Sequence, residues 1–368
     1  MTRVFASVLI DTYNHERFIE QAIVSVLEQD FPATDREIII VDDGSTDRTP
    51  EIVRKFEPHV RLLRKENGGQ ASAFNAGIPE CKGEIVAFLD GDDWWAQKKL
   101  SRVAGVLTAV PEVGMVGHGT VTVFADGNRQ VEALRDGHRF SLRTATGAHM
   151  FRTRKSFLGT RSTVRRNLLA KLLPVPESIR IEADEFVFTM AAALGEVEIL
   201  PETLFFYRLH RGNLFSQQGF NENNVRRKQQ SVAKLAESLT TRLREIAVSD
   251  EVVRIVVQAI QAEADQLRLS VDGGVPWETV RTELTMYQVL HGDAPWTHRA
   301  FKYATLMPAF FLPPRLYYGA RRWLAASDWY VNARRVFFPV PQPRHLNRSR
   351  NGGAQQTELR NDSRHESS

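Results

Sequence analysis

Three aspartates that follow one apolar run, Asp90, Asp92 and Asp93, have the types and spacing best suited to chemistry. Left bare, three carboxylates on one turn repel one another. Hard divalent cations such as Mg²⁺ and Mn²⁺ take oxygen ligands, often one or two carboxylates together with the phosphates of a substrate. The cluster therefore predicts a Mn²⁺ or Mg²⁺ site that joins the protein to a diphosphate. The spacing alone is equally consistent with a solvated acidic turn that caps the next helix.

Polar residues also follow the three preceding apolar runs of the chain. They lie at Asp11–Asn14, Asp42–Ser45 and Glu66–Gly69. In an open α/β sheet, ligands bind beyond the carboxyl ends of the strands, so four successive strand ends bring polar groups to one edge. This convergence favours a ligand site over an isolated acidic turn. A carboxylate at Asp42–Ser45 can accept a hydrogen bond from a nucleobase, or it can serve only a turn and a helix cap.

The elements that must position these residues are short apolar runs alternating with amphipathic stretches. The runs that we read as strands are Val4–Ile10, Glu37–Val41, Val60–Leu63 and Glu84–Leu89. Helix spacing lies between them, and this βαβαβαβα order predicts an α/β fold with a Rossmann-like, mostly parallel sheet flanked by helices. Polar sequence with helix periodicity, from Asn221 to about Gln288, predicts a C-terminal helical region.

Composition excludes several broad classes of protein. Apolar residues make up 42% of the chain and charged residues 25%, which excludes wholesale disorder and collagen-like or coiled-coil chains. The single cysteine, Cys81, excludes an intrachain disulfide and a zinc site with two or more cysteines. Runs of about 18 apolar residues and a signal-peptide pattern at the start are both missing. We therefore expect no ordinary transmembrane helix and a cytoplasmic protein.

Positive charge is concentrated near the C-terminus. The net charge is +4, yet residues 296–350 carry ten Lys and Arg against one acid, Asp328. Cations beside Trp and Tyr fit an in-plane anchor on an anionic bilayer, so we expect peripheral attachment to the inner face of the cell membrane. A helical hairpin packed on the main domain and an oligomer interface are the alternatives. Nucleic acid is not expected as a partner, because the main body of the chain is acidic.

Several of these residues stand in motifs that resemble those of family 2 glycosyltransferases, which have the GT-A fold. In family order the motifs are Ser7–Asn14, Ser25–Gln29, Val41–Asp47, Asn67–Gly69, Asn75–Ile78 and Phe88–Trp94, and weaker likeness continues to about residue 215. The resemblance implies an inverting, metal-dependent enzyme that moves a sugar from a nucleotide-sugar, with a UDP-sugar expected, to a hydroxyl of a glycan or lipid-linked acceptor. The signature Gln-x-x-Arg-Trp of processive synthases is absent, which favours transfer of a single sugar.

The resemblance also assigns roles to individual positions. It implies nucleotide-sugar contacts at Thr12, Tyr13, Asp43, Asn67, Asn75, Asp90 and Arg208, and metal contacts at Asp92, Asp93 and His210. The family's catalytic base stands at a helix start downstream of the metal motif, a place that Ile181–Phe186 matches. We choose Asp184 as the base and keep Glu182 as the alternative, although these acids can also serve only to favour a helix N-terminus. Gln70 stands near the place where the family often has an arginine.

We expect four segments along the 368 residues. Residues 1–220 form the catalytic domain, with the donor half at about 1–110 and the acceptor half at about 111–220. Residues 221–295 form the helical region, and residues 296–340 form the basic, aromatic, membrane-associating segment. Residues 341–368, rich in Asn, Gln, Arg and Ser, form a disordered tail.

Two other functions stay open. A nucleotidyltransferase can use the same aspartates and would release pyrophosphate, and a degenerate relative can act as a sugar-nucleotide-binding scaffold. The GxGxxG fingerprint is missing after the first strand, which disfavours a dinucleotide oxidoreductase. The basic stretch Arg152–Arg166, with Ser162 and Thr163, faces either the acceptor or only solvent.

Overall fold

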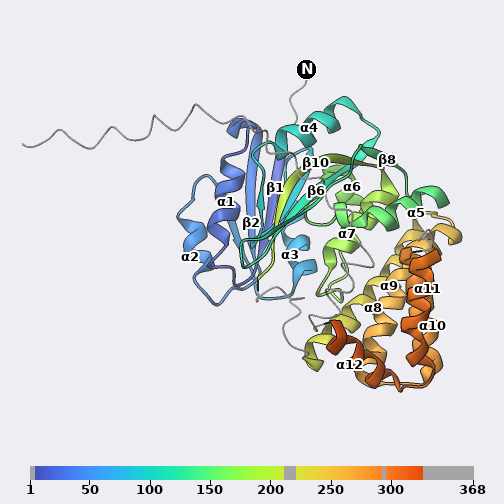
Figure 1. The fold of residues 1–368 in the computed structure, drawn as a ribbon. Helices are drawn as coiled ribbons and strands as arrows, with labels where there is room; N and C mark the ends of the chain where they lie inside the picture. Colours follow the sequence, from blue (N-terminus) through green and yellow to red (C-terminus); the bar gives the residue numbers. More distant parts are fainter. Residues whose placement is uncertain (1–4, 211–220, 292–295, 326–368) are drawn as a thin grey trace, which may run out of the picture. The chain divides into compact units, whose positions relative to one another are not determined.

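The computed structural model describes residues 5–210, 221–291 and 296–325 (Figure 1). Its strands are β1 Ala6–Thr12, β2 Arg36–Asp42, β3 Arg61–Arg64, β4 Ile85–Asp90, β5 Trp94–Trp95, β6 Val113–Val123, β7 Arg129–Glu132, β8 His138–Phe140, β9 Thr163–Arg165 and β10 Glu196–Arg208. Its α-helices are α1 Ile19–Leu27, α2 Thr49–Arg54, α3 Gln70–Gly77, α4 Lys99–Ala109, α5 Ala145–Arg154, α6 Arg166–Leu172, α7 Ala183–Leu194, α8 Glu222–Glu245, α9 Asp250–Asp272, α10 Pro276–His291, α11 Trp296–Leu306 and α12 Pro314–Ala325. Short 3₁₀ turns are η1 Ala33–Asp35, η2 Ile78–Glu80, η3 Lys155–Phe157 and η4 Met307–Phe310. The predicted tail, 341–368, and the end of the basic aromatic segment, 326–340, lie outside the described residues.

The strands form one mixed sheet in the order β3-β2-β1-β4-β9-β6-β10-β5, with β7 beside β6 and β8 beside β10. Strands β1 to β4, β6 and β10 run in one direction, and β9 runs against both of its neighbours, β4 and β6. The predicted fold, a mostly parallel sheet flanked by helices and followed by a helical region, is confirmed. The antiparallel β9 lies within the stretch 152–166 that the sequence suggested as an acceptor-facing or solvated segment.

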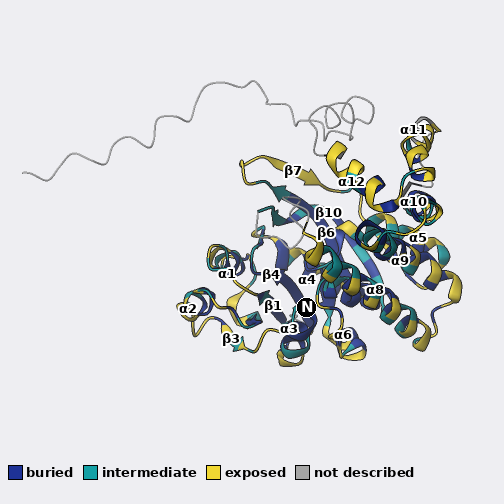
Figure 2. Ribbon diagram, turned by 90° about the horizontal axis from the view of Figure 1, so that it is seen from below, coloured by how far each residue is buried: buried dark blue, intermediate teal, exposed yellow. Residues whose placement is uncertain are grey.

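Helices cover both faces of the sheet (Figure 1). In β1, Leu9 packs with Phe74 of α3 and Phe186 of α7, whereas Val8 and Ile10 pack on the opposite face, in the cluster that contains Ile23 of α1. Successive side chains of a strand point to opposite faces, so a strand buried on both faces reads as a continuous apolar run. Figure 2 accordingly shows the central strands as buried. This packing places the carboxyl ends of β1, β2 and β4 at one edge.

Helices α8 and α9 share an apolar core with the sheet domain. Val232 and Leu239 of α8 and Val256 of α9 belong to the same cluster as Phe186 of α7. Both helices begin with side-chain caps, because Asn221 accepts a hydrogen bond from the amide of Asn224 and Ser249 accepts one from the amide of Val252. The helical region is therefore packed directly on α7.

Helices α11 and α12 pack through a separate, smaller cluster. Tyr317 and Tyr318 of α12 lie against Leu269 of α9 and Val280 of α10. Figure 2 shows α12 as largely exposed on its other side. Among the residues that the structure describes, no helix is both long and apolar enough to cross a membrane.

Candidate active site

The loops that follow β1 and β2 are tied together by hydrogen bonds. Asn14 has a left-handed backbone (φ 57°); its amide donates to Ser45 Oγ (2.9 Å), and its side-chain oxygen accepts from the amide of Thr46 (2.8 Å). The amide of His15 donates to Thr49 Oγ1 (2.9 Å). Asparagine tolerates this backbone conformation better than most residues, which explains its place in the turn. The two predicted donor-binding loops therefore form one fixed edge, on which Tyr13 is exposed.

Asp43 is the buried centre of this edge. Its carboxylate accepts hydrogen bonds from Lys65 Nζ (2.8 Å) and from the amides of Gly68 (3.0 Å) and Gly69 (2.7 Å). Asn67 donates its side-chain N–H to the Asp43 carbonyl (3.0 Å). Gly69 has φ +86°, and a Cβ there would lie 2.8 Å from the carbonyl oxygen of Arg180, so the close turn requires glycine. The predicted residues Asp43 and Asn67 thus lie together, and Asp43 is held as an ordered acceptor.

Asp90, Asp92 and Asp93 converge at the end of β4, with one carboxylate oxygen of each within 4.8 Å of the others. Burial, followed by the charges of neighbouring aspartates, raises the pKa of Asp90 and of Asp93 well above the usual range. The buried Oδ2 of Asp93 receives no hydrogen bond from any described residue. Crowded carboxylates and a buried oxygen without a donor are the donor set that a hard divalent cation satisfies. The cluster fits Mn²⁺ or Mg²⁺.

Asp92 differs from its two neighbours because histidines face it. His210 Nε2 lies 3.0 Å from its carboxylate and His15 Nε2 lies 3.8 Å away. Burial acts to raise the pKa of Asp92, but the hydrogen bond from His210 and the charge of His15 outweigh it, and the net result is a lowered pKa. Asp92 is therefore the member of the cluster that stays ionised most readily.

Arg208 joins the aspartate cluster to two aromatic rings. Its amide donates to Asp93 Oδ1 (2.7 Å) and its Nε donates to the Asp92 carbonyl (2.9 Å). The guanidinium carbon lies 4.8 Å from the centre of the Phe18 ring and 4.5 Å from that of Trp94. A planar cation held between rings next to an acidic site is well placed to meet a phosphate. The structure thus brings the predicted residues Arg208 and His210 to the cluster, and Phe18 and Trp94 with them.

Asp184 stands in the first turn of α7 and is linked to Asp90 through two other residues. Thr160 links the two aspartates, because its hydroxyl donates to Asp90 Oδ2 (2.6 Å) and its amide hydrogen-bonds the Asp184 carboxylate. Gln70 links them as well: its side-chain oxygen accepts from the Asp184 amide (3.3 Å) and its Nε2 lies 3.5 Å from Asp90 Oδ1. Burial and then the charge of Glu185 raise the pKa of Asp184 to about 6. A carboxyl with this pKa can exchange a proton near neutral pH.

Asp11 lies in the same site, although it was not among the predicted site residues. Burial and then the charge of Asp184 raise its pKa to about 7, and Gln70 hydrogen-bonds its side chain. Its buried Oδ1 accepts no hydrogen bond from any described residue. The available signal was an aspartate next to last in the first apolar strand, directly before Thr12, whose hydroxyl contacts His15 Nδ1 (3.2 Å).

Two predicted residues point to other parts of the protein. The Glu182 carboxylate contacts Lys228 of α8 (3.1 Å), and burial, opposed by that lysine, raises its pKa to about 7. The side-chain amide of Asn75 exchanges two hydrogen bonds with the backbone of Val175, at 2.9 and 2.8 Å. Asn75 holds the loop before α7 in this structure, and its contact with a donor stays a prediction.

The basic stretch before α7 differs from our expectation. Ser162 and Thr163 are buried, with Thr163 inside β9. Arg165 Nε donates to the Val113 carbonyl (2.7 Å) and Arg166 Nε donates to the Gly83 carbonyl (2.7 Å). Their side chains anchor β9 and the start of α6 because a buried carbonyl needs a donor. The charge of Arg161, in the same stretch, acts to lower the pKa values of Asp184 and Asp93.

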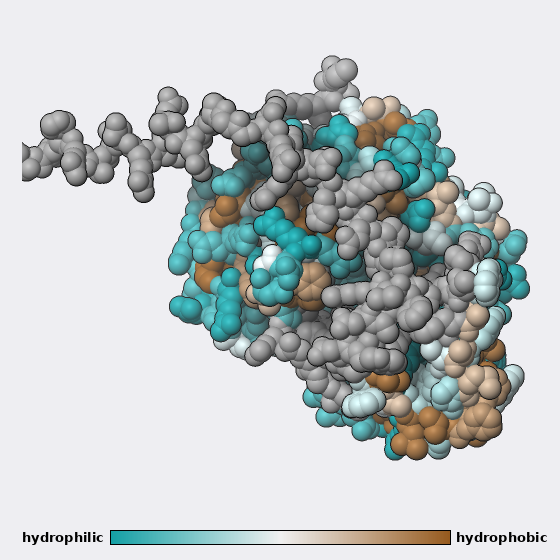
Figure 3. All heavy atoms as spheres, viewed as in Figure 1, coloured by the Kyte–Doolittle hydropathy of each residue, from teal (hydrophilic) through white to brown (hydrophobic). Residues whose placement is uncertain are grey.

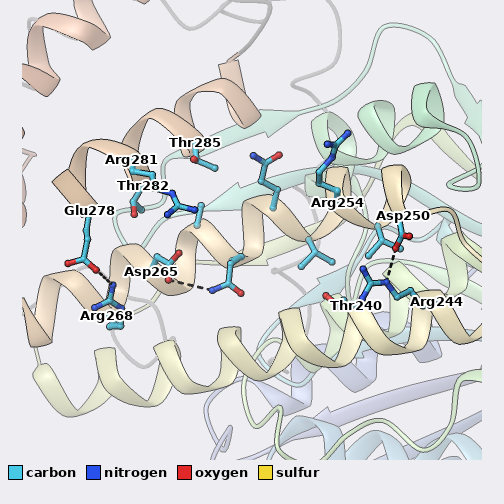
Figure 4. Close-up of a pocket in the computed structure, with 15 residues that line it drawn as sticks. Thr240, Arg244, Asp250, Arg254, Asp265, Arg268, Glu278, Arg281, Thr282 and Thr285 are labelled. Carbon is cyan, nitrogen blue, oxygen red and sulfur yellow. Dashed lines mark hydrogen bonds and ion pairs between the residues drawn. The ribbon is translucent and has the colours of Figure 1, made fainter. Parts of the chain in front are cut away.

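A hollow of about 570 Å³ lies away from these residues, between α8, α9 and α10. Figure 4 shows two ion pairs within it, Arg244–Asp250 (2.8 Å) and Arg268–Glu278 (2.9 Å). All of its lining residues come from these three helices, and none is a predicted site residue. The hydrogen bonds of Glu278 with Val275 and Arg268 lower its pKa, so this acid is no candidate base. This hollow is therefore separate from the candidate active site at the ends of the strands.

Comparison with known proteins supports the family resemblance and the fold. Residues 7–172 match the model of the family described as glycosyl transferase family 2. An uncharacterized glycosyltransferase of Nostoc is 36% identical over 215 residues, which cover 56% of this chain and 65% of that relative, so the chain spans less than two thirds of the relative's length. Among solved structures, Staphylococcus aureus TarS 1–349 in complex with UDP-GlcNAc has a TM-score of 0.52 at 21% identity, covering 83% of this chain and 91% of that one. A mannosyltransferase of Pyrobaculum calidifontis in complex with GDP-Man and Mn²⁺ has a TM-score of 0.51 at 20% identity, covering 92% and 85%. These two likenesses concern the fold.

Proposed function

Residues 7–172 match the model of glycosyl transferase family 2, and from this match we propose that the chain is a member of the family and transfers one sugar from a nucleotide-sugar to an acceptor hydroxyl, with inversion at the anomeric carbon. The observation that carries the proposal is the double link between Asp90 and Asp184, through Thr160 and Gln70. It sets an acidic cluster suited to a metal-bound diphosphate beside a carboxyl suited to proton transfer. Inverting transfer needs these two functions next to each other.

The donor lies along the edge formed by the β1 and β2 loops. Asp43, held by the amides of Gly68 and Gly69, accepts a hydrogen bond from the base, and the exposed ring of Tyr13 stacks on it. Asn67 and Thr12 line the same edge. We propose a UDP-sugar as the donor, in keeping with the UDP-GlcNAc bound by the TarS structure, while the GDP-Man bound by the Pyrobaculum enzyme defines the second donor to test.

A Mn²⁺ or Mg²⁺ ion is the cofactor of this proposal. The residues that would hold it are Asp92 and Asp93, together with Asp90. His210, which contacts the Asp92 carboxylate, would be the fourth. When bound, such an ion offsets the negative charge that grows on the departing nucleoside diphosphate. Arg208, whose guanidinium lies over the rings of Phe18 and Trp94, adds a positive charge at the diphosphate end of the donor.

Asp184 is the base of the proposed reaction. Its carboxylate takes the proton of the acceptor hydroxyl while that oxygen bonds to the anomeric carbon, and the bond from this carbon to the diphosphate oxygen breaks on the opposite face. The electron pair leaves with the nucleoside diphosphate, and the proton stays on Asp184 until solvent removes it. Asp11 feels the charges of both Asp184 and Asp92, and its buried Oδ1 accepts no hydrogen bond from the described residues, so we assign this oxygen to a hydroxyl of the donor sugar.

The rate should follow the protonation of Asp184. Below about pH 6 its carboxyl is mostly protonated and cannot accept a proton, because burial has raised its pKa to about 6. With Mn²⁺ kept saturating at every pH, we expect kcat/KM to fall about tenfold for each pH unit below that value and to level off above it. A pH–rate profile of nucleoside diphosphate release measures this, and a profile that stays flat down to pH 4.5 would contradict the assignment.

Donor screening by calorimetry tests the function itself. UDP-GlcNAc, GDP-Man and a dTDP-sugar are titrated with and without Mn²⁺, and the products are analysed after incubation with water or simple glycans as acceptors. Release of a nucleoside diphosphate supports the transferase. Release of pyrophosphate from a sugar phosphate and a nucleoside triphosphate would instead identify a nucleotidyltransferase, and metal-dependent binding without any turnover would identify a scaffold.

We propose that the acceptor is a glycan or lipid-linked molecule reached at an anionic membrane surface, on the cytoplasmic side. Trp296, Phe311 and Trp323, in the basic aromatic segment that begins at residue 296, have exposed fractions of 72–78%. Figure 3 shows hydrophobic residues gathered where Figure 1 places α10 and α12. Helix α11 carries Arg299 and Lys302, and α12 carries three arginines, without any acid in either helix. Exposed aromatic rings among cations suit the headgroup region of an anionic bilayer.

Replacing Trp296, Phe311 and Trp323 together with serine should reduce binding to vesicles of phosphatidylcholine and phosphatidylglycerol by about tenfold or more, because each exposed ring loses the apolar area it buries in the bilayer. Co-sedimentation of the full chain with vesicles measures the bound fraction. Val131→Ser, which removes an exposed apolar side chain from β7, is the matched control and should bind normally. Unchanged sedimentation of the triple variant would exclude this surface as the membrane contact.

A further inference from the structure

We propose that helix α8 positions the catalytic base: Lys228 and Ser231 hold residues 181 and 182, and so fix where α7 begins and where Asp184 lies. The inference rests on the proposed function, in which Asp184 is the base. Lys228 and Ser231 are then positioning residues, because neither lies in the cluster that receives the donor. The helical region becomes part of the transferase site.

The residue before α7 has a backbone conformation that must be held in place. Glu182 has φ +62° and ψ 33°, the left-handed region, which a residue with a Cβ rarely adopts. Its side chain makes no cap for the helix. In the first turn, the Glu185 amide donates to the Glu182 carbonyl (3.2 Å) and the Asp184 amide donates to Gln70 Oε1 (3.3 Å). A rare conformation without a local cap persists when contacts from elsewhere determine it.

Helix α8 supplies those contacts at two successive residues. Ser231 Oγ accepts a hydrogen bond from the Ile181 amide (3.0 Å) and donates one to the Ile181 carbonyl (2.8 Å), so it satisfies both backbone groups of that residue. Lys228 Nζ lies 3.1 Å from the Glu182 carboxylate and 2.8 Å from that of Glu263 on α9. Ser231 is buried, which makes its two bonds expensive to lose.

The position of Asp184 follows from this attachment. Asp184 is two residues after Glu182, and its side chain is confined against Gly159, where an added Cβ would lie 2.9 Å from Asp184 Oδ2. If residue 182 relaxes to an ordinary backbone, the first turn of α7 must rotate or unwind, and the Asp184 carboxylate leaves Thr160. A misplacement of about 1 Å at a reacting group can cost on the order of 10²-fold in rate. The donor edge meets this segment at Gly69, beside Arg180, and at Gln70, which accepts from the Asp184 amide, whereas Lys228 and Ser231 hold residues 181 and 182.

The other charges around this turn do not replace Lys228. Lys155 of η3 is 2.8 Å from Glu185, the acid that follows Asp184, and it acts on Glu182 and Glu263 through its charge at longer range. Glu263 would be left beside Glu182 without the lysine between them, so the two acids would repel each other. Removing Lys228 therefore takes away a contact that holds residue 182 and leaves the Glu182 carboxylate repelled by that of Glu263.

The experiment measures kcat, donor affinity and amide exchange in full-length variants. With UDP-GlcNAc and Mn²⁺, or GDP-Man if the wild type prefers it, Lys228→Met should lower kcat by about 10- to 100-fold and leave the donor Kd within about twofold. Lys228→Arg, which keeps the charge, should recover most of the rate. Ser231→Ala should lower kcat in the same way. The matched control is Lys234→Met, which removes an exposed lysine of α8 that pairs with Glu237 and should behave as wild type.

Hydrogen exchange gives a readout that does not require turnover. In Lys228→Met the amides of residues 182–185 should exchange at least about tenfold faster than in the wild type, while those of β1 and β4 stay protected. Unchanged exchange there, or a wild-type kcat in a folded Ser231→Ala, overturns the positioning role. So does a loss of donor affinity in parallel with kcat. If the wild type itself turns over no donor, the proposed function fails, and the exchange data alone decide whether α8 holds α7.

Discussion

Replacing Asp184 with asparagine is expected to lower the rate of sugar transfer by about 10³-fold, within the range that a general base contributes, and to leave the donor Kd within about twofold. Asparagine has nearly the same shape and can still accept the hydrogen bond from the Thr160 amide, but it cannot take a proton from the acceptor hydroxyl. The donor contacts at Asp43 and at the aspartate cluster are untouched. Nucleoside diphosphate release gives kcat, and calorimetry gives the affinity.

Glu182→Gln is the comparison that separates the two candidate bases. The Glu182 carboxylate contacts Lys228, so its amide variant should lose no more than about tenfold, through weaker holding of the turn. A loss of about 10³-fold in Glu182→Gln with near-normal turnover in Asp184→Asn would reverse the assignment. Comparable large losses in both would show that the two acids act together.

The donor side of the site could be predicted because its parts are local in sequence. Each polar turn directly follows an apolar run, and parallel strands send their carboxyl ends to the same edge, so Asp43 and Asp90 must lie near each other. The prediction did not depend on knowing which distant side chains contact each other. The same logic pointed to Asp11, which is next to last in β1 and lies beside Asp90 in the register of the sheet, although Thr12 and Tyr13 were chosen instead.

The base side could be predicted only in part, because long-range contacts determine it. Glu182 and Asp184 are two residues apart and both acidic, and composition alone does not distinguish them. What distinguishes them is the left-handed backbone at Glu182, which turns its side chain toward Lys228, 46 positions later. Asn75 was a plausible donor contact by motif, yet its amide is engaged by Val175, 100 residues away.

The C-terminal aromatic residues show a different limit. The sequence left a membrane surface, a packed hairpin and an oligomer interface open for them, and the structure shows some of these residues buried and others exposed. Tyr317 and Tyr318 are buried against Leu269, whereas Phe311 and Trp323 are exposed. The two tyrosines are adjacent in α12, so the helix seats a broad face on the protein and leaves the remainder for another contact. The sequence shows how many aromatic residues the segment has, but it does not show which of them are buried and which are exposed.

The second large effect concerns the ion that the aspartate cluster would hold. Asp92→Asn is expected to abolish the stabilisation of the protein by a nucleotide-sugar with Mn²⁺, which in the wild type should be about 5 °C at 100 times Kd. Asp92 is the cluster member whose pKa is lowered, so it supplies a carboxylate charge at neutral pH while raised pKa values favour the protonated forms of Asp90 and Asp93. Without it, the cluster loses the carboxylate that ionises most readily, and an arriving cation has one anionic ligand fewer. Transfer should fall by about 10³-fold or more.

The pH dependence of metal binding checks this account independently of turnover. A cation must displace the protons of Asp90 and Asp93, so the apparent affinity of the wild type for Mn²⁺ should increase as the pH rises from 5.5 to 7.5. Asp126→Asn, which changes an exposed aspartate in the turn between β6 and β7, should keep both the Mn²⁺-dependent stabilisation and the transfer rate. Because Asp92→Asn keeps an acceptor for His210, a loss confined to metal-dependent binding identifies the missing charge as the cause. Normal stabilisation by donor and Mn²⁺ in Asp92→Asn would mean that the ion, if one binds, is held elsewhere.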